Sequence, residues 1–159
     1  MNTNKNDKVI ERIVNQAIAL ETMSLNLAVR LIQTVEDKAQ ELGINVVVAV
    51  SDASGRPIAV HCMDNAYHGS FDVAINKTYT ATAFQMPTKD LSKLCQPGED
   101  LYGLQFSNNG KVMILGGGEP LLVGETMIGA LGVSGGTAEQ DIFLASYGKS
   151  MLKEVIKWL

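Results

Sequence analysis

Two segments near the start of the chain carry apolar residues at three- and four-residue spacing, the pattern of an amphipathic helix. The second segment begins after Ser24, a favourable N-cap, and ends at Gly43, a residue type common just past a helix. Both segments are therefore predicted to be helices. The first, over residues 7–20, has the apolar positions Val9, Ile10, Ile13, Val14, Ala17 and Ile18.

The pattern then changes to that of strands. Residues 44–50 form a β-branched run that is short enough for a buried strand. Residues 52–56 have turn chemistry, so residues 57–63 are expected to return as the partner strand of a hairpin. Further strands are expected over residues 111–115, 120–123 and 127–133.

The remaining elements complete an α+β pattern. A helix is expected over residues 71–84, and the last helix begins at Thr137, which with Gln140 matches a capping box. Residues 96–110 have no strong period and are a candidate lid or interface segment. Hairpins with tight turns imply a mainly antiparallel sheet of about five strands, flanked by helices. A doubly wound parallel sheet is not expected.

Composition limits the classes of function. The 159 residues, 46% hydrophobic and 19% charged, are typical of one globular domain. A net charge of −4 without a run of lysines or arginines argues against nucleic-acid binding, and the apolar runs are too short to span a membrane. The first residues do not resemble a secretion signal, so a cytoplasmic location is expected. Cys62 and Cys95 lie far apart and are expected to be free thiols.

Two glycine-rich segments are candidate ligand sites. The run Gly116, Gly117 and Gly118 lacks a P-loop pattern, so a tight turn or bulge explains it better than nucleotide binding. The segment from Ser134 through Gly135 and Gly136 to Thr137 lies where a strand ends and a helix begins. A helix N-terminus favours an anionic group, although a plain strand-to-helix turn explains the same residues.

A few polar side chains carry further chemistry. Asp64 and Lys77 are candidates to fix a polar ligand or to move a proton, and the alternative is that both are simply solvated. His61, Cys62, Met63 and His68 are the candidate metal-ligating cluster. A divalent metal site is not expected there, because it needs three or four convergent ligands and His61 and Cys62 point to opposite faces of a strand. Haem needs only one or two axial ligands, so both histidines remain candidate haem ligands.

Three stretches together resemble the GlcG/HbpS-like family, which includes haem-binding HbpS, GlcG and the C-terminal domain of PduO-type proteins. They are residues 48–55 with Met63 and Asp64, then residues 77–84 with Pro87 and Thr88, and then residues 116–120 and 128–136 with residues 139–141. The resemblance begins near Ser24. It implies a profilin-like layered domain over residues 21–159, homo-oligomers and, in several members, binding of haem or a related tetrapyrrole; no established reaction comes with it. The positions that match the family motif are Asp64, Lys77, Gly117, Gly118, Pro120, Ser134, Gly135, Gly136 and Asp141.

Residues 1–20 lie outside the resemblance and form a predicted amphipathic extension. This extension is similar to the encapsulation peptides that recruit enzymes to bacterial microcompartments, in which PduO-type proteins operate. The alternative is an extra helix that packs on the domain or on a neighbouring subunit.

Three functions remain open at this point. The first is an accessory protein that binds haem or a corrinoid-related ligand between subunits, with carboxylates at the two glycine-rich segments, Lys77 as countercharge and His61 or His68 near iron. The second is an enzyme that acts on a small carboxylate or an aldehyde-derived metabolite, with Asp64 and Lys77 as acid and base. The third is a structural or cargo-adaptor protein that is recruited through residues 1–20.

Overall fold

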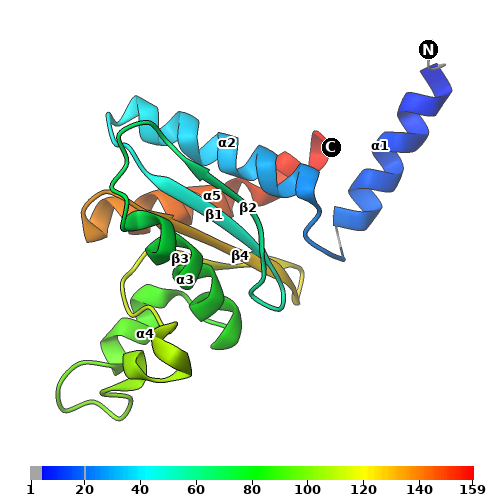
Figure 1. The fold of residues 1–159 in the computed structure, drawn as a ribbon. Coiled ribbons are helices and arrows are strands. Elements are labelled where there is room, and N and C mark those ends of the chain that lie inside the picture. Colours follow the sequence, from blue (N-terminus) through cyan, green and yellow to red (C-terminus); the bar gives the residue numbers. More distant parts are fainter. Residues whose placement is uncertain (1–4, 20) are drawn as a thin grey trace.

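The computed structural model describes residues 5–19 and 21–159 of the chain, which form the helices and strands drawn in Figure 1. One four-stranded antiparallel sheet has the strand order β2-β1-β4-β3. Its strands are β1 (Val47–Asp52), β2 (Pro57–Cys62), β3 (Gly118–Val123) and β4 (Thr126–Ser134). The predicted α+β class with an antiparallel sheet is therefore confirmed.

Helices cover both faces of this sheet. On one face lie α2 (Leu25–Glu41) and α5 (Ala138–Lys157), and on the other lies α3 (Ser70–Ala83) (Figure 1). Alternate residues of β1 point to the two faces: Val48 and Val50, with Val46 just before the strand, join the large core under α2 and α5. Val47 and Ala49 pack with Ala74 of α3. Because side chains alternate along a strand, the unbroken apolar run of β1 buries both of its faces.

The boundaries of the helices follow the predicted caps. The Ser24 hydroxyl accepts a hydrogen bond from the amide of Leu27 at the start of α2. Thr137 and Gln140 form the reciprocal capping box at the start of α5. Each cap satisfies amides that the first turn of a helix cannot pair internally.

The expected count of about five strands is wrong by one, because residues 111–115 are not a strand. The hydroxyl oxygen of Thr80 accepts a hydrogen bond from the amide of Met113, and Val112 packs with Leu91 and Cys95 away from the sheet. A side chain of α3 thus binds backbone that a neighbouring strand would otherwise pair. The region also contains α4 (Thr88–Leu94) and the short 3₁₀ helices η1 (Leu104–Phe106) and η2 (Asn108–Gly110).

Helix α1 (Lys5–Ala19) lies beside the C-terminal end of α5 and projects away from the sheet (Figure 1). The Gln16 side chain donates a hydrogen bond to the carbonyl of Lys157, and Ala19 is buried. The rest of its apolar stripe is open: the side chains of Val9, Ile10, Ile13, Val14 and Ile18 are 44–60% exposed. The division into an extension over residues 1–20 and a domain over residues 21–159 remains a prediction, and residues 1–4 and 20 lie outside the described residues.

Candidate functional site

The two glycine-rich segments meet at one cavity of about 280 Å³, which we call the inner cavity. It lies where β4 ends and α5 begins, and the loop before β3 closes its other side. Of the predicted ligand-binding residues, the inner cavity is lined by Lys77, Gly116, Ser134, Gly135 and Gly136.

Lys77 is held behind the turn formed by Gly135 and Gly136. Its side chain is 1% exposed, and the ammonium Nζ donates to Asp141 Oδ2 at 2.8 Å and to the carbonyl of Val133 at 2.6 Å. Burial lowers the pKa of Lys77 below its usual 10.5, while the charge and hydrogen bond of Asp141 act in the opposite direction. The second carboxylate oxygen of Asp141 accepts the amide of Gly136 at 2.9 Å. Asp141 therefore holds the lysine and the turn together.

The backbone amides near this cavity are largely used within the chain. Thr137 donates its amide to Gln140 Oε1 at 2.8 Å, and Gly118 donates its amide to the Thr88 hydroxyl at 2.9 Å. The amide of Gly136 is bound to Asp141. The amides of Gly118, Gly136 and Thr137, which were expected to bind a ligand carboxylate, therefore already have side-chain partners. The anion at the N-terminus of α5 is thus supplied by the protein itself.

Glycine is required at positions 117 and 135, because other atoms of the protein lie where a side chain would begin. Gly117 has φ +111°, and a Cβ there would lie 2.9 Å from Lys77 Nζ; Gly135 has φ +147°, and a Cβ would lie 2.5 Å from the carbonyl oxygen of Asn45. Any side chain at either position would combine an unfavourable backbone conformation with a clash. Gly117 and Gly118 line neither the inner cavity nor the larger cavity described below, and Pro120 is buried in β3.

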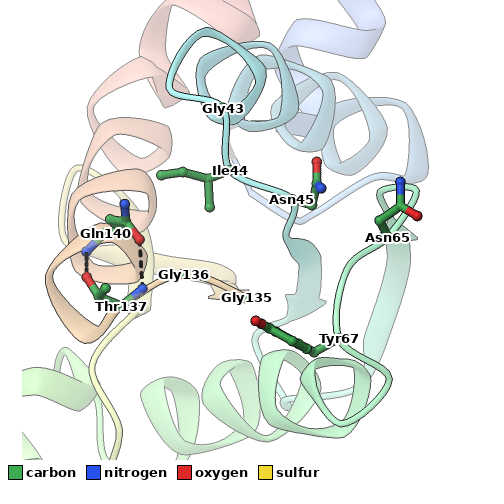
Figure 2. A pocket seen from close by; sticks show the side chains of 9 residues that line it. All are labelled: Gly43, Ile44, Asn45, Asn65, Tyr67, Gly135, Gly136, Thr137 and Gln140. Carbon is green, nitrogen blue, oxygen red and sulfur yellow. Dashed lines mark hydrogen bonds between the residues drawn. The ribbon is translucent and has the colours of Figure 1, made fainter.

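A larger cavity of about 440 Å³ lies on the open side of the same turn, and we call it the outer cavity. In Figure 2 the hydroxyl end of Tyr67 points toward Gly135. Asn45 and Asn65 lie on one side of the cavity, and the hydrogen-bonded pair Thr137 and Gln140 lies on the other. Tyr67, Gly135 and Gly136 line both cavities, so the two are neighbours. Residue Tyr67 is 75% exposed.

The other predicted residues lie outside these cavities. Asp64 and His68 are exposed and line neither cavity. His61 Nδ1 lies 3.1 Å from Glu36 Oε2 of α2, and this histidine also lines neither cavity. Within residues 5–19 and 21–159, no group of three or more His, Cys, Asp or Glu side chains is placed to hold a metal ion.

Sequence reasoning missed the residues that complete the site. Asp141 matched the family motif, but its pairing with Lys77 across 64 positions was not inferred. Tyr67 is the one aromatic residue of the polar loop over residues 64–70, a signal that was available in the sequence. Asn45 and Asn65 carry no motif, and only the fold brings them to the turn at Gly135.

Comparison with known proteins places the chain in a family. The model of the family described as haem degrading protein HbpS-like matches residues 23–149. A 15.0 kDa protein encoded between dhaT and dhaS in Citrobacter freundii is 39% identical over 142 residues, which cover 89% of this chain and all of that protein. The corrinoid adenosyltransferase PduO of Salmonella typhimurium is 40% identical over 116 residues, which are 73% of this chain but 34% of PduO. The chain therefore corresponds to about a third of PduO.

Solved structures agree with this assignment. Klebsiella pneumoniae protein ORFY has a TM-score of 0.81 at 38% identity, covering 84% of this chain and 92% of ORFY. The PduOC structure, solved as a haem complex, has a TM-score of 0.78 at 36% identity, covering 81% of this chain and 94% of PduOC. HbpS, at 24% identity and a TM-score of 0.72, shares the fold. The extent of the family match and the identity to full-length relatives show that the chain belongs to the HbpS-like family.

Proposed function

We propose that the chain is an accessory protein that binds haem or a related tetrapyrrole in the groove where the inner and outer cavities meet. Family membership and the PduOC haem complex support this proposal. The structural observation that carries it is the exposed aromatic residue Tyr67 between two adjoining cavities. A planar macrocycle gains most from stacking on such an aromatic face.

The residues around the groove fit a flat, largely apolar guest. Ile44 lines the outer cavity, and Val73 and Leu115 line the inner cavity, so each offers apolar contact next to Tyr67. Ligand sites combine such apolar walls with a few polar groups that fix orientation. When bound, haem would supply an iron centre whose reactivity depends on its axial ligand and on the polarity around it.

Of the two candidate axial ligands we favour His68, although its side chain lines neither cavity. It is exposed and directly follows Tyr67, which lines both cavities, whereas Nδ1 of His61 lies 3.1 Å from the carboxylate of Glu36. We therefore assign His68 as the candidate iron ligand, with Tyr67 as the stacking residue. Lys77 supplies no countercharge in this proposal, because Asp141 neutralises it.

Titration with hemin tests the proposal. The Soret band should shift on addition of the protein, and His68→Ala should change the bound spectrum while the matched variant His61→Ala leaves it unchanged. Tyr67→Ala should weaken binding by about tenfold, because stacking of the macrocycle on an aromatic ring is worth on the order of 1 kcal/mol or more. Absence of any Soret shift in the unaltered protein would remove haem binding. A spectrum that His61→Ala alone changes would reverse the choice of ligand.

The enzyme alternative has less support in the geometry. It requires Asp64 and Lys77 to work together, but the partner of Lys77 is Asp141, and Asp64 is exposed and lines neither cavity. A catalytic acid and base must both reach the reacting group. We therefore keep ligand binding as the primary proposal.

A second candidate function is recruitment into a larger assembly, a bacterial microcompartment or a homo-oligomer, through α1. The specific observation is its open apolar stripe, since a half-apolar helix normally buries that face against a partner. Ile10→Ser with Ile13→Ser should abolish co-sedimentation with isolated microcompartments. The control Lys8→Ser with Arg12→Ser, on the charged face, should not. If the stripe instead joins copies of this chain, light scattering will report a smaller particle for the stripe variant, and co-sedimentation will be unaffected.

A further inference from the structure

The outer cavity is lined without any charged side chain. Its walls come from three separate segments: residues 43–45 after α2, residues 65–67 before α3, and residues 135–140 at the start of α5. The polar side chains among them are the amides of Asn45, Asn65 and Gln140, the hydroxyl of Thr137 and the phenol of Tyr67. None of the described residues that line this cavity is an Asp, Glu, Lys, Arg or His.

Hydrogen-bond donors of the neighbouring turn already have partners within the protein. The ammonium of Lys77 is bound to Asp141, and the amides of Gly136 and Thr137 at the start of α5 are bound to side chains of that helix. The first turn of α5 also carries Glu139, whose pKa is lowered below its usual 4.5 by hydrogen bonds from its own amide and from Thr137. A ligand carboxylate would therefore lose water and meet negative charge without a compensating cation.

Three neutral groups remain available to a ligand. Within the described part of the chain, the side chains of Asn45, Asn65 and Tyr67 make no hydrogen bond to protein. Asn65 has φ +66°, and it lines the outer cavity on the side opposite Thr137 and Gln140 (Figure 2). An amide side chain offers both two donors and an acceptor, so it pairs best with a group of the same kind.

We propose that the outer cavity is a subsite for uncharged hydrogen-bonding groups, carboxamides above all, and that it discriminates against carboxylates. This inference rests on the proposed function, in which a macrocycle stacks on Tyr67. In the bound state, neutral amide side groups of the macrocycle face Asn45 and Asn65, and any carboxylates remain in solvent.

The test compares two macrocycles that differ only in two side groups, which are charged acceptors in one and neutral amides in the other. Hemin carries two propionates, and hemin bis-amide carries two carboxamides in their place. Tryptophan fluorescence quenching and Soret titration at fixed ionic strength should give a dissociation constant about tenfold lower for the bis-amide. Equal affinity, or tighter binding of hemin, overturns the subsite.

Two substitutions check that the selectivity comes from the outer cavity. Asn45→Lys places a cation in the wall and should reverse the preference, so that hemin binds more tightly than the bis-amide. Asn65→Asp should weaken hemin more than the bis-amide through like-charge repulsion. Its matched control is Asn109→Asp, an exposed asparagine that also has positive φ, at +57°, and that lines neither cavity.

The outcomes separate the two proposals. If neither macrocycle binds, the proposed function fails and the subsite falls with it. If both bind with the same constant and Asn45→Lys changes neither, tetrapyrrole binding stands and the subsite is wrong. A reversal by Asn45→Lys together with an unaltered response of Asn109→Asp supports the subsite.

Discussion

The turn at Gly135 and Gly136 separates two groups of polar side chains. Behind it, Lys77 and Asp141 are buried, and each is satisfied by the other and by backbone of β4 or of the turn. In front of it, Asn45 and Asn65 are exposed and make no hydrogen bond to the described protein. The charged groups would attract attention in a sequence, yet each already has a charged partner and a backbone partner within the chain. The neutral groups are the ones that remain free for a ligand.

The largest expected effect comes from breaking the buried pair. Asp141→Ala leaves the ammonium of Lys77 buried without a countercharge and should lower the free energy of unfolding by about 3–5 kcal/mol. The double variant Lys77→Met with Asp141→Leu removes both charges and should lose much less. Urea unfolding measures both. A double variant as unstable as Asp141→Ala would mean that the ion pair is not what the turn depends on.

A smaller effect is expected at the exposed carboxylate of the first turn of α5. The lowered pKa of Glu139 means that its contribution to stability is present above its usual pKa of 4.5 and is lost as pH falls through the lower folded value. The stability difference between the unaltered protein and Glu139→Gln should therefore shrink in acid. Urea unfolding from about pH 6 to pH 3 measures it, with Glu125→Gln in the β3–β4 turn as control. If the stability difference between the unaltered protein and Glu139→Gln did not change with pH, the lowered pKa of Glu139 would be contradicted.

The smallest effect on stability is expected on the open side of the turn. Asn45→Ala removes an exposed side chain without a protein partner, so the free energy of unfolding should change by less than about 0.5 kcal/mol. The same variant should weaken binding of hemin bis-amide, because a ligand partner is lost. Thermal melting and titration of one preparation give both values. A marked loss of stability would show that Asn45 supports the fold and is not free for a ligand.

Much of the fold was predictable because local rules and tertiary packing agree. The stripe of α2, the cap at Ser24 and the capping box at Thr137 each act within one or two helical turns, so they can be identified in sequence. Residues 111–115 were mistaken for a strand because their pattern suits one, whereas the Thr80 hydroxyl from α3 binds that backbone instead. When a side chain takes the place of a strand partner, the hydrophobic pattern of the sequence does not change.

The candidate site was predictable only in part. Glycine-rich segments identified the backbone of the inner cavity, because a bend that allows close approach excludes side chains. The pairing of Lys77 with Asp141 and the wall formed by Asn45 and Asn65 depend on contacts between distant segments. Similarly, α1 and α2 have equally clear apolar stripes, but the stripe of α2 is buried and that of α1 is open. Periodicity predicts a helix without predicting what covers it.

The order in which the chain is synthesised gives the long-range pairing a further consequence. Lys77 emerges from the ribosome well before Asp141, and both cavities take one wall from the start of α5. A nascent chain that has completed β1 to β3 therefore still lacks the groove, however well those strands are formed. In the proposed function, a ligand can therefore bind only after α5 has docked.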